Sequence, residues 1–289
     1  MTDEQSASLW HRMWPFALLC VLASVFWLLL DRYPEINFTL GSDAAACGLL
    51  AILSLALMLF SRGLAITPSR ALRGAIAGAL VLAGPAVGTF LHASTLDPGS
   101  LAIALCLTPV AVGVAEGVAS DIGFSNEALW PGLAAAVGLL LVLPSPSIAD
   151  WHNDAAMVLA PILTGIGCVL LRRNAASAIA SATAGFAGAA IVFAIGAGAG
   201  AAMQHARPQV SVTAVAIDAA LSLLALTALS RLAAEQYAAR YSLVPLLILV
   251  QGPLMLHSLV TWRSVVCAAL LLAAAIKLLR SNSLEKVTS

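Results

Sequence analysis

Charged residues are scarce in this sequence, and that scarcity limits what the protein can be. Of its 289 residues, 10% are charged and 61% are hydrophobic, with a mean hydropathy of +0.98. A soluble domain carries roughly 25% charged residues, so this composition cannot cover a water-exposed surface. The formal net charge is zero, which gives no sign of a nucleic-acid partner. The sequence therefore predicts an integral membrane protein.

Motifs of disulfide scaffolds, metal sites and enzymes are also missing. The five cysteines lie inside apolar runs without CxxC spacing, so we expect small apolar side chains and no disulfides or metal ligands. No Walker A, HExxH or GxSxG motif is present. We therefore expect neither an enzyme nor an ATP-driven pump, and no cofactor. No short apolar segment with a cleavage site precedes the first run, so no signal peptide is expected.

Long apolar runs are what the sequence does contain. A helix needs ~20 apolar residues to cross the hydrocarbon core of a bilayer. Ten runs approach this length: 13–30, 44–60, 72–93, 99–120, 127–144, 155–171, 179–203, 211–233, 242–260 and 263–279. We expect an all-α membrane protein with ten transmembrane helices, and short tails at 1–12 and 281–289.

Lysine and arginine are distributed unevenly between the connections. One side would carry eleven: Arg12, Arg62, Arg70, Arg73, Arg172, Arg173, Arg231, Arg240, Lys277, Arg280 and Lys286. The other side would carry three: Arg32, Arg207 and Arg263. The positive-inside rule then predicts an inner (plasma) membrane protein with both termini in the cytoplasm. In this assignment no lysine or arginine lies mid-span, which disfavours substrates that carry phosphate groups.

The two halves of the chain resemble each other in the same order. Three pairs of segments match: 16–32 with 158–173, 106–117 with 242–253, and 128–143 with 260–275. These matches divide the chain into halves at about 13–144 and 155–279, and an odd number of spans in each half inverts the second copy. Inverted repeats are typical of secondary transporters, which bind substrate near the bilayer midplane between the repeats.

Residues 99–120 combine a run of membrane-spanning length with a proline and an acid. At about 100° per residue, Pro109 and Glu116 fall on one side of the helix together with small residues. A charged side chain at the centre of a helix in lipid costs ~2.5–3.5 kcal/mol, so this side suits a cavity or close-packed neighbours. Two interpretations stay open: a solvated transport pathway, or a packed, kinked helix whose acid lies near the headgroups.

The segments LDPGSLAIALCLTPVAVGVAEGVAS, LWPGLAAAVGLLLVL and ALSRLAAEQYAARYSLVPLLILVQGP resemble the drug/metabolite transporter superfamily, specifically its ten-helix EamA-type permeases. The sixth span ending LLRRN also fits, and Trp27 stands where the family often has a first-span tryptophan. The Gly-Glu pair usual at the ends of the fourth and ninth spans is missing; Gly123 and His257 occupy roughly the Glu position. The resemblance implies two inverted five-helix repeats, a central cavity, alternating access and export of amino acids or related metabolites.

Asp218 is the sharpest candidate for chemistry, in TAVAIDAALSLLAL with Ser222 one turn further along. A buried carboxylate costs several kcal/mol unless it is protonated or paired, so Asp218 would bind a cationic group or couple transport to protons. The alternative is an interfacial acid at a helix start. Glu116 is a second candidate for such a role, and the alternative for it is a surface acid near cytoplasmic water.

Five further residues are candidates for the substrate or ion pathway. Gln251 would hydrogen-bond a ligand, or only a neighbouring helix. His257 would serve as a gate or proton relay, or it only lies next to the headgroups. Trp27 would form a wall of the cavity, while Pro109 and Pro245 would supply kinks about which the repeats rock.

These features favour a secondary transporter that moves a small zwitterionic or cationic metabolite outward by alternating access. Coupling to protons and assembly into a homodimer stay open, and lipids surround the protein. One alternative is a flippase for a lipid or lipid-linked intermediate. The second alternative is a membrane scaffold or sensor that transports nothing.

Overall fold

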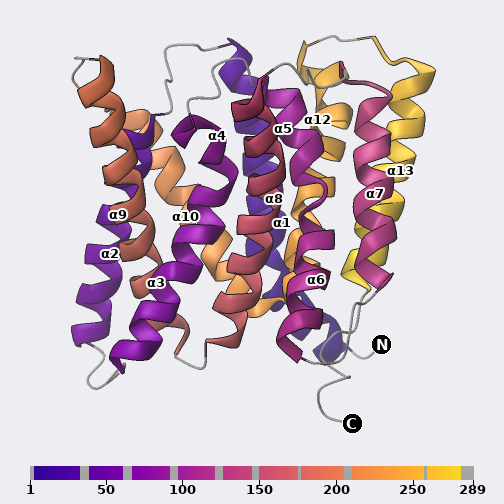
Figure 1. The fold of residues 1–289 in the computed structure, drawn as a ribbon. Helices are drawn as coiled ribbons and strands as arrows, with labels where there is room; N and C mark the ends of the chain where they lie inside the picture. Colours follow the sequence, from indigo (N-terminus) through magenta and orange to yellow (C-terminus); the bar gives the residue numbers. More distant parts are fainter. Residues whose placement is uncertain are drawn as a thin grey trace.

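The structure is a computed structural model in which every assigned element is a helix (Figure 1). It describes residues 3–32, 39–60, 67–91, 97–120, 126–144, 150–174, 177–204, 210–256 and 259–280. In chain order the helices are α1 Asp3–Arg32, α2 Leu40–Phe60, α3 Pro68–Ala83, the short 3-10 helix η1 Gly84–Ala86, α4 Val87–Phe90, α5 Pro98–Leu105, α6 Thr108–Ser120, α7 Asn126–Leu140, α8 Trp151–Arg173, α9 Ala178–Gln204, α10 Val212–Arg231, α11 Ala234–Ala238, α12 Arg240–Leu256 and α13 Trp262–Leu279.

Within these described ranges, nine helical segments are long and apolar enough to cross a membrane, which supports an integral membrane protein. Several of the nine combine consecutive helices: Pro68–Phe90 joins α3, η1 and α4, and Pro98–Ser120 joins α5 and α6. The predicted span 127–144 corresponds to α7, whose apolar part Ala128–Leu140 is shorter than the other nine. Of the ten predicted transmembrane helices, nine therefore correspond to segments of spanning length, and the tenth corresponds to a shorter helix that packs along α13.

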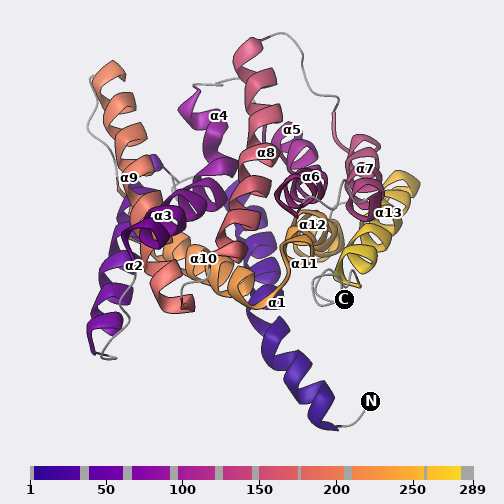
Figure 2. The same ribbon diagram turned by 60° about the horizontal axis from the view of Figure 1, so that its bottom comes forward.

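The helices form one bundle, with α2 and α9 at one edge and α7 and α13 at the opposite edge in both views (Figures 1 and 2). The beginning of α1 and the end of α13 lie at the same end of this bundle, at the bottom of Figure 1. We call this the terminus end and the other the far end. Tryptophans close to helix ends are exposed, including Trp130, Trp151 and Trp262 at 67–70%. Exposed tryptophans at helix ends are typical of residues that lie at the membrane–water interface.

Small residues let the helices pack closely. A Cβ atom on Gly78 of α3 would lie 2.2 Å from the Cα atom of Gly185 of α9, so α3 cannot carry a side chain at this position unless the helices move apart. The five cysteines are free and buried, as expected. Because lipid offers no hydrophobic drive between helices, such contacts hold the bundle by van der Waals packing.

Besides Pro68–Phe90, two further spanning segments are interrupted, and their interruptions lie close together. The turn at Cys106–Leu107 separates α5 from α6, and a turn at Ala239 separates α11 from α12. Pro245 has no N–H, so it cannot bond the Tyr241 carbonyl four residues earlier. The thiol of Cys106 donates to that carbonyl across 3.1 Å. The two interruptions therefore meet, and one supplies the hydrogen bond that the other lacks.

One predicted boundary was wrong in a way that matters for the site. The ninth span was predicted at 242–260, but the apolar helical segment runs from Ala234 to Met255. Arg240 was therefore counted among the residues of a cytoplasmic connection. It lies inside the spanning segment, six residues from its start, which is about 9 Å along a helix.

Candidate functional site

A cavity of about 360 Å³ opens among α1, α5, α7 and α12. Its wall is mostly aliphatic, from Leu, Val, Ile and Ala side chains, and includes Trp27 and Pro245. On α1 the lining runs from Leu19 to Trp27, which is about 12 Å along the helix axis. The start of α5 at Pro98 and the residues after α7 lie toward the far end of the bundle (Figure 1), so the lining extends to that end.

The floor of the cavity carries a positive charge. Arg240 and Tyr241, the first two residues of α12, line the cavity on its side nearer the terminus end, which we call the floor. The guanidinium carbon of Arg240 lies 4.5 Å from the ring centroids of both Tyr237 and Tyr241. One of its Nη atoms donates to the Tyr241 hydroxyl. These contacts offset part of the cost of holding the cation within the membrane segment, because a desolvated cation–π contact contributes ~2 kcal/mol.

The charge of Arg240 is not neutralised by the protein where the structure describes it. None of the described carboxylates forms an ion pair with Arg240, and its buried Nε has no hydrogen-bond partner. The predicted ninth span left Arg240 outside the membrane segments, whereas the structure has it inside a segment of spanning length. The rings of Tyr237 and Tyr241 lie against its guanidinium, so the charged residue is accommodated inside an otherwise apolar segment.

Trp27 and Pro245, two of the eight predicted site residues, line this cavity. Trp27 is 43% exposed on α1 and contributes to the upper wall. Pro245 lies inside α12, and the helix interruption comes earlier, at Ala239. Sequence reasoning missed Arg240 and Tyr241; the spacing Tyr-x-x-Arg-Tyr at one helical turn was the signal available.

Asp218 and Ser222 lie elsewhere, at the contact of α10 with α2. Asp218 is 9% exposed, and its carboxyl group lies beside Ser42 and Asp43 in the first turn of α2. One of its oxygens, Oδ2, is buried without a hydrogen-bond partner. Ser222 lies beside Cys47 on the same interface. Asp43 was not predicted as a site residue; it stands where the sequence suggested a connection.

Glu116, Pro109 and Gln251 also lie outside the cavity lining. Glu116 is partly exposed on α6 toward the terminus end, where the charges of Glu235 and Arg173 are its neighbours. Pro109 is buried at the second position of α6. Gln251 is partly buried on α12, with an unpartnered Oε1 atom. His257 lies outside the described residues. Neither predicted acid reaches the cavity, so the proposed contact of Asp218 and Glu116 with one cationic substrate does not fit it.

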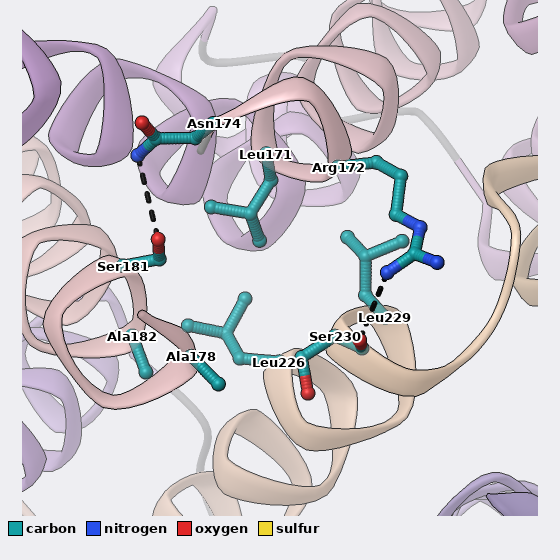
Figure 3. A pocket seen from close by; sticks show the side chains of 9 residues that line it. All are labelled: Leu171, Arg172, Asn174, Ala178, Ser181, Ala182, Leu226, Leu229 and Ser230. Carbon is teal, nitrogen blue, oxygen red and sulfur yellow. Dashed lines mark hydrogen bonds between the residues drawn. The ribbon is translucent and has the colours of Figure 1, made fainter. Parts of the chain in front are cut away.

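A second pocket, of about 150 Å³, lies where α8 ends and α9 begins (Figure 3). Its polar groups already have protein partners. Arg172 donates to the Ser230 carbonyl at 3.0 Å, and Asn174 donates to the Arg70 carbonyl at 3.1 Å and to the Ser181 hydroxyl at 3.5 Å. Because these groups are satisfied within the chain, this pocket is a weaker candidate than the cavity that holds Arg240.

Comparisons with known proteins place the fold but not the activity. The chain matches no protein-family model and no curated protein sequence. A solved structure described only as "Crystal structure of protein" superposes on 90% of this chain and 96% of its own length, with a TM-score of 0.67 and 13% sequence identity. At this identity the likeness concerns the arrangement of helices alone.

Proposed function

We propose that the protein is a secondary transporter that carries a small organic solute through the Arg240 cavity by alternating access. The observation that carries this proposal is a solute-sized cavity inside a bundle of spanning helices, next to two interrupted helices. Interrupted helices at corresponding positions of two halves are the best structural pointer to a transporter binding site. The resemblance to EamA-type permeases and the inner-membrane orientation with cytoplasmic termini belong to this proposal.

The pattern of helix contacts supports an inverted repeat. If α1 corresponds to α8, α2 to α9, α3 to α10, α5–α6 to α11–α12 and α7 to α13, the contacts of one half reappear in the other. For example, α3 packs on α8 and α9, and α10 packs on α1 and α2. Likewise α5 and α6 pack on α8, and α12 packs on α1. The two halves exchange partners as two related five-helix units would, with α7 counted as the tenth crossing.

The paired carboxyl groups support proton coupling. Asp43 and Asp218 lie side by side on α2 and α10, which belong to different proposed repeats. Two carboxylates this close cannot both carry a charge without a large repulsion, so a proton shared between them would respond to the relative position of the two helices. The cavity and this pair lie in different interfaces, which suits coupling through helix motion.

Alternating access can be tested without knowing the substrate. Ala23→Cys introduces a thiol into the cavity wall on α1, and an anionic, membrane-impermeant thiol reagent is applied to oriented vesicles from either face. The expected result is labelling from both faces. Labelling from one face should slow when conditions favour the state in which the cavity opens to the opposite face. Ala46→Cys is the matched control because Ala46 is 0% exposed. The unsubstituted chain, whose cysteines are buried, gives the background.

The labelling result separates the candidate functions. Labelling of Ala23→Cys from one face alone, under every condition of pH, would contradict alternating access and favour the scaffold or sensor. The thiolate fraction of the introduced cysteine varies with pH, so the ratio of the labelling rates from the two faces is the quantity to follow. In the Asp218→Asn variant we expect this ratio to lose its dependence on pH, since one of the two acids can no longer ionise. Full pH dependence in that variant would refute the coupling role.

A further inference from the structure

We propose that the cavity binds the anionic head of a monocarboxylic acid with an apolar body, and that Arg240 is the residue that recognises the carboxylate. This inference rests on the proposed transport function and specifies the chemical class of its substrate. It is argued from the charge, shape and lining of the cavity.

The guanidinium is available for an anion. Arg240 lines the cavity and carries five N–H donors. The structure pairs one Nη with Tyr241, and Nε is unpartnered but buried, so the two Nη atoms are the donors that an anion in the cavity would reach. The rigid fork of a guanidinium matches a carboxylate through two parallel hydrogen bonds. In a cavity within the membrane segment such a pair is screened less than in water, so the anion would gain more from it than at an exposed arginine. The Tyr241 hydroxyl is a further polar group beside the anion.

The wall above Arg240 suits an apolar body. Leu105, Leu139 and Val244 are among the aliphatic residues that line it, from three different helices. The volume of about 360 Å³ is larger than the ~150 Å³ of an apolar cavity that binds benzene, so it is enough for a small organic acid. A bound acid would thus place its charge at the floor and its carbon chain against leucine and valine.

The lining selects against other charges. No carboxylate is among the described residues that line the cavity, so the ammonium group of an amine or amino acid would find no counter-charge. A phosphate dianion carries two negative charges, and among the described lining residues Arg240 alone carries a positive one, so one negative charge would stay uncompensated. A monoanion is the charge that one guanidinium balances. A free carboxylic acid and an anionic lipid share this chemistry, and the experiment distinguishes them.

The test uses four ligands built on one six-carbon chain: hexanoate, hexanamide, norleucine and hexylamine. Their binding to the purified full-length protein in detergent is measured by isothermal titration calorimetry. We expect hexanoate to bind at least tenfold more tightly than hexanamide and hexylamine, because a hydrogen-bonded ion pair is worth more than its neutral counterpart. Norleucine, with the same carboxylate and an added ammonium group, should bind more weakly than hexanoate. Equal binding of all four would overturn the proposal.

Variants locate the site. Arg240→Gln keeps a side chain with hydrogen-bond donors but removes the charge, and should weaken hexanoate at least tenfold while leaving hexanamide unchanged. Arg172→Gln removes an arginine of the second pocket and should change neither. Undiminished hexanoate binding by Arg240→Gln would refute the assignment. If that variant does not fold, Arg240→Lys and the four-ligand series on the unsubstituted chain still decide, since a charge-dependent site must rank the ligands as stated.

Two further outcomes keep the proposals apart. Competition of hexanoate by phosphatidylglycerol but not by phosphatidylcholine in nanodiscs would support the anion site and identify a lipid headgroup as its source. Absence of such competition supports a water-soluble acid. Labelling of Ala23→Cys from both faces, together with no preference for hexanoate, would support the proposed transport function and refute the proposed anion selectivity. Labelling from one face alone, together with a preference for hexanoate, would support the anion site and refute alternating access.

Discussion

The close contact of α9 with α3 predicts an unusually large effect for the smallest possible substitution. In Gly188→Ala, the new Cβ atom would lie 2.1 Å from the carbonyl oxygen of Ala75, where an ordinary contact begins at 3.4 Å. The obstacle is backbone, so the two helices must separate by more than about 1 Å along their contact. Overpacking of this kind costs typically ~1–3 kcal/mol.

The matched control lies on the same helix. A Cβ atom on Gly198 would meet nothing within 4 Å, so Gly198→Ala makes the same chemical exchange in α9 without the clash. Both variants gain the same ~1 kcal/mol of helix propensity, and this contribution cancels when they are compared. We expect Gly188→Ala to be less stable than Gly198→Ala by ~1–3 kcal/mol in unfolding by sodium dodecyl sulfate, followed by circular dichroism. Equal stabilities would show that α3 and α9 do not approach as closely as described.

Two more predictions concern local hydrogen bonds. Cys106→Ala should destabilise the protein by about 1 kcal/mol, because it leaves the Tyr241 carbonyl without its thiol donor. Pro245→Ala supplies the missing N–H, so in a double-mutant cycle of unfolding free energies the cost of Cys106→Ala should shrink; an unchanged cost would refute the compensation. Asp150 caps α8, and hydrogen bonds from the side chain and backbone N–H of His152 lower the pKa of its carboxyl. Asp150→Ala should therefore lower the melting temperature at neutral pH, and the difference from the unsubstituted chain should fade as pH falls through that depressed pKa; a difference that persists in strong acid would contradict a role for the carboxylate.

Hydropathy located most of the helices because lipid-facing surfaces must be apolar whatever the helix packs against. Residues such as Leu57 and Ile195, exposed at 63% and 67%, supply that signal. The same signal fails where polar residues are sheltered by protein. In α11, Glu235 is 4% exposed, and together with Arg240 it lowers the apparent hydropathy of a segment that is nonetheless helical and of spanning length. The predicted start at residue 242 fell after both of them.

The candidate site was only partly predictable for a related reason. Asp43 stands four residues into a described segment that begins at Thr39, and a sequence pattern gives an acid near a helix start an ordinary role at the interface. Only the packing of α2 on α10 brings it beside Asp218. Glycine contacts, in contrast, were predictable in kind, since small residues repeated on one face indicate close helices; the partner helix was not.

The sign of the charge in the cavity is a better guide to the substrate than the number of acids in the membrane segments. An intramembrane acid such as Asp218 can be accommodated in a helix interface, where a neighbouring carboxyl or hydroxyl group shares a proton. An arginine cannot give up its proton, so it carries its full charge wherever it lies. Replacing a buried charge by apolar residues is often neutral or stabilising, so packing alone gives no reason for Arg240 beside an open, aliphatic cavity. An anion in the cavity would lower the free energy of holding the guanidinium charge away from water. That gain strengthens the binding of the ligand, whereas the empty protein folds without it.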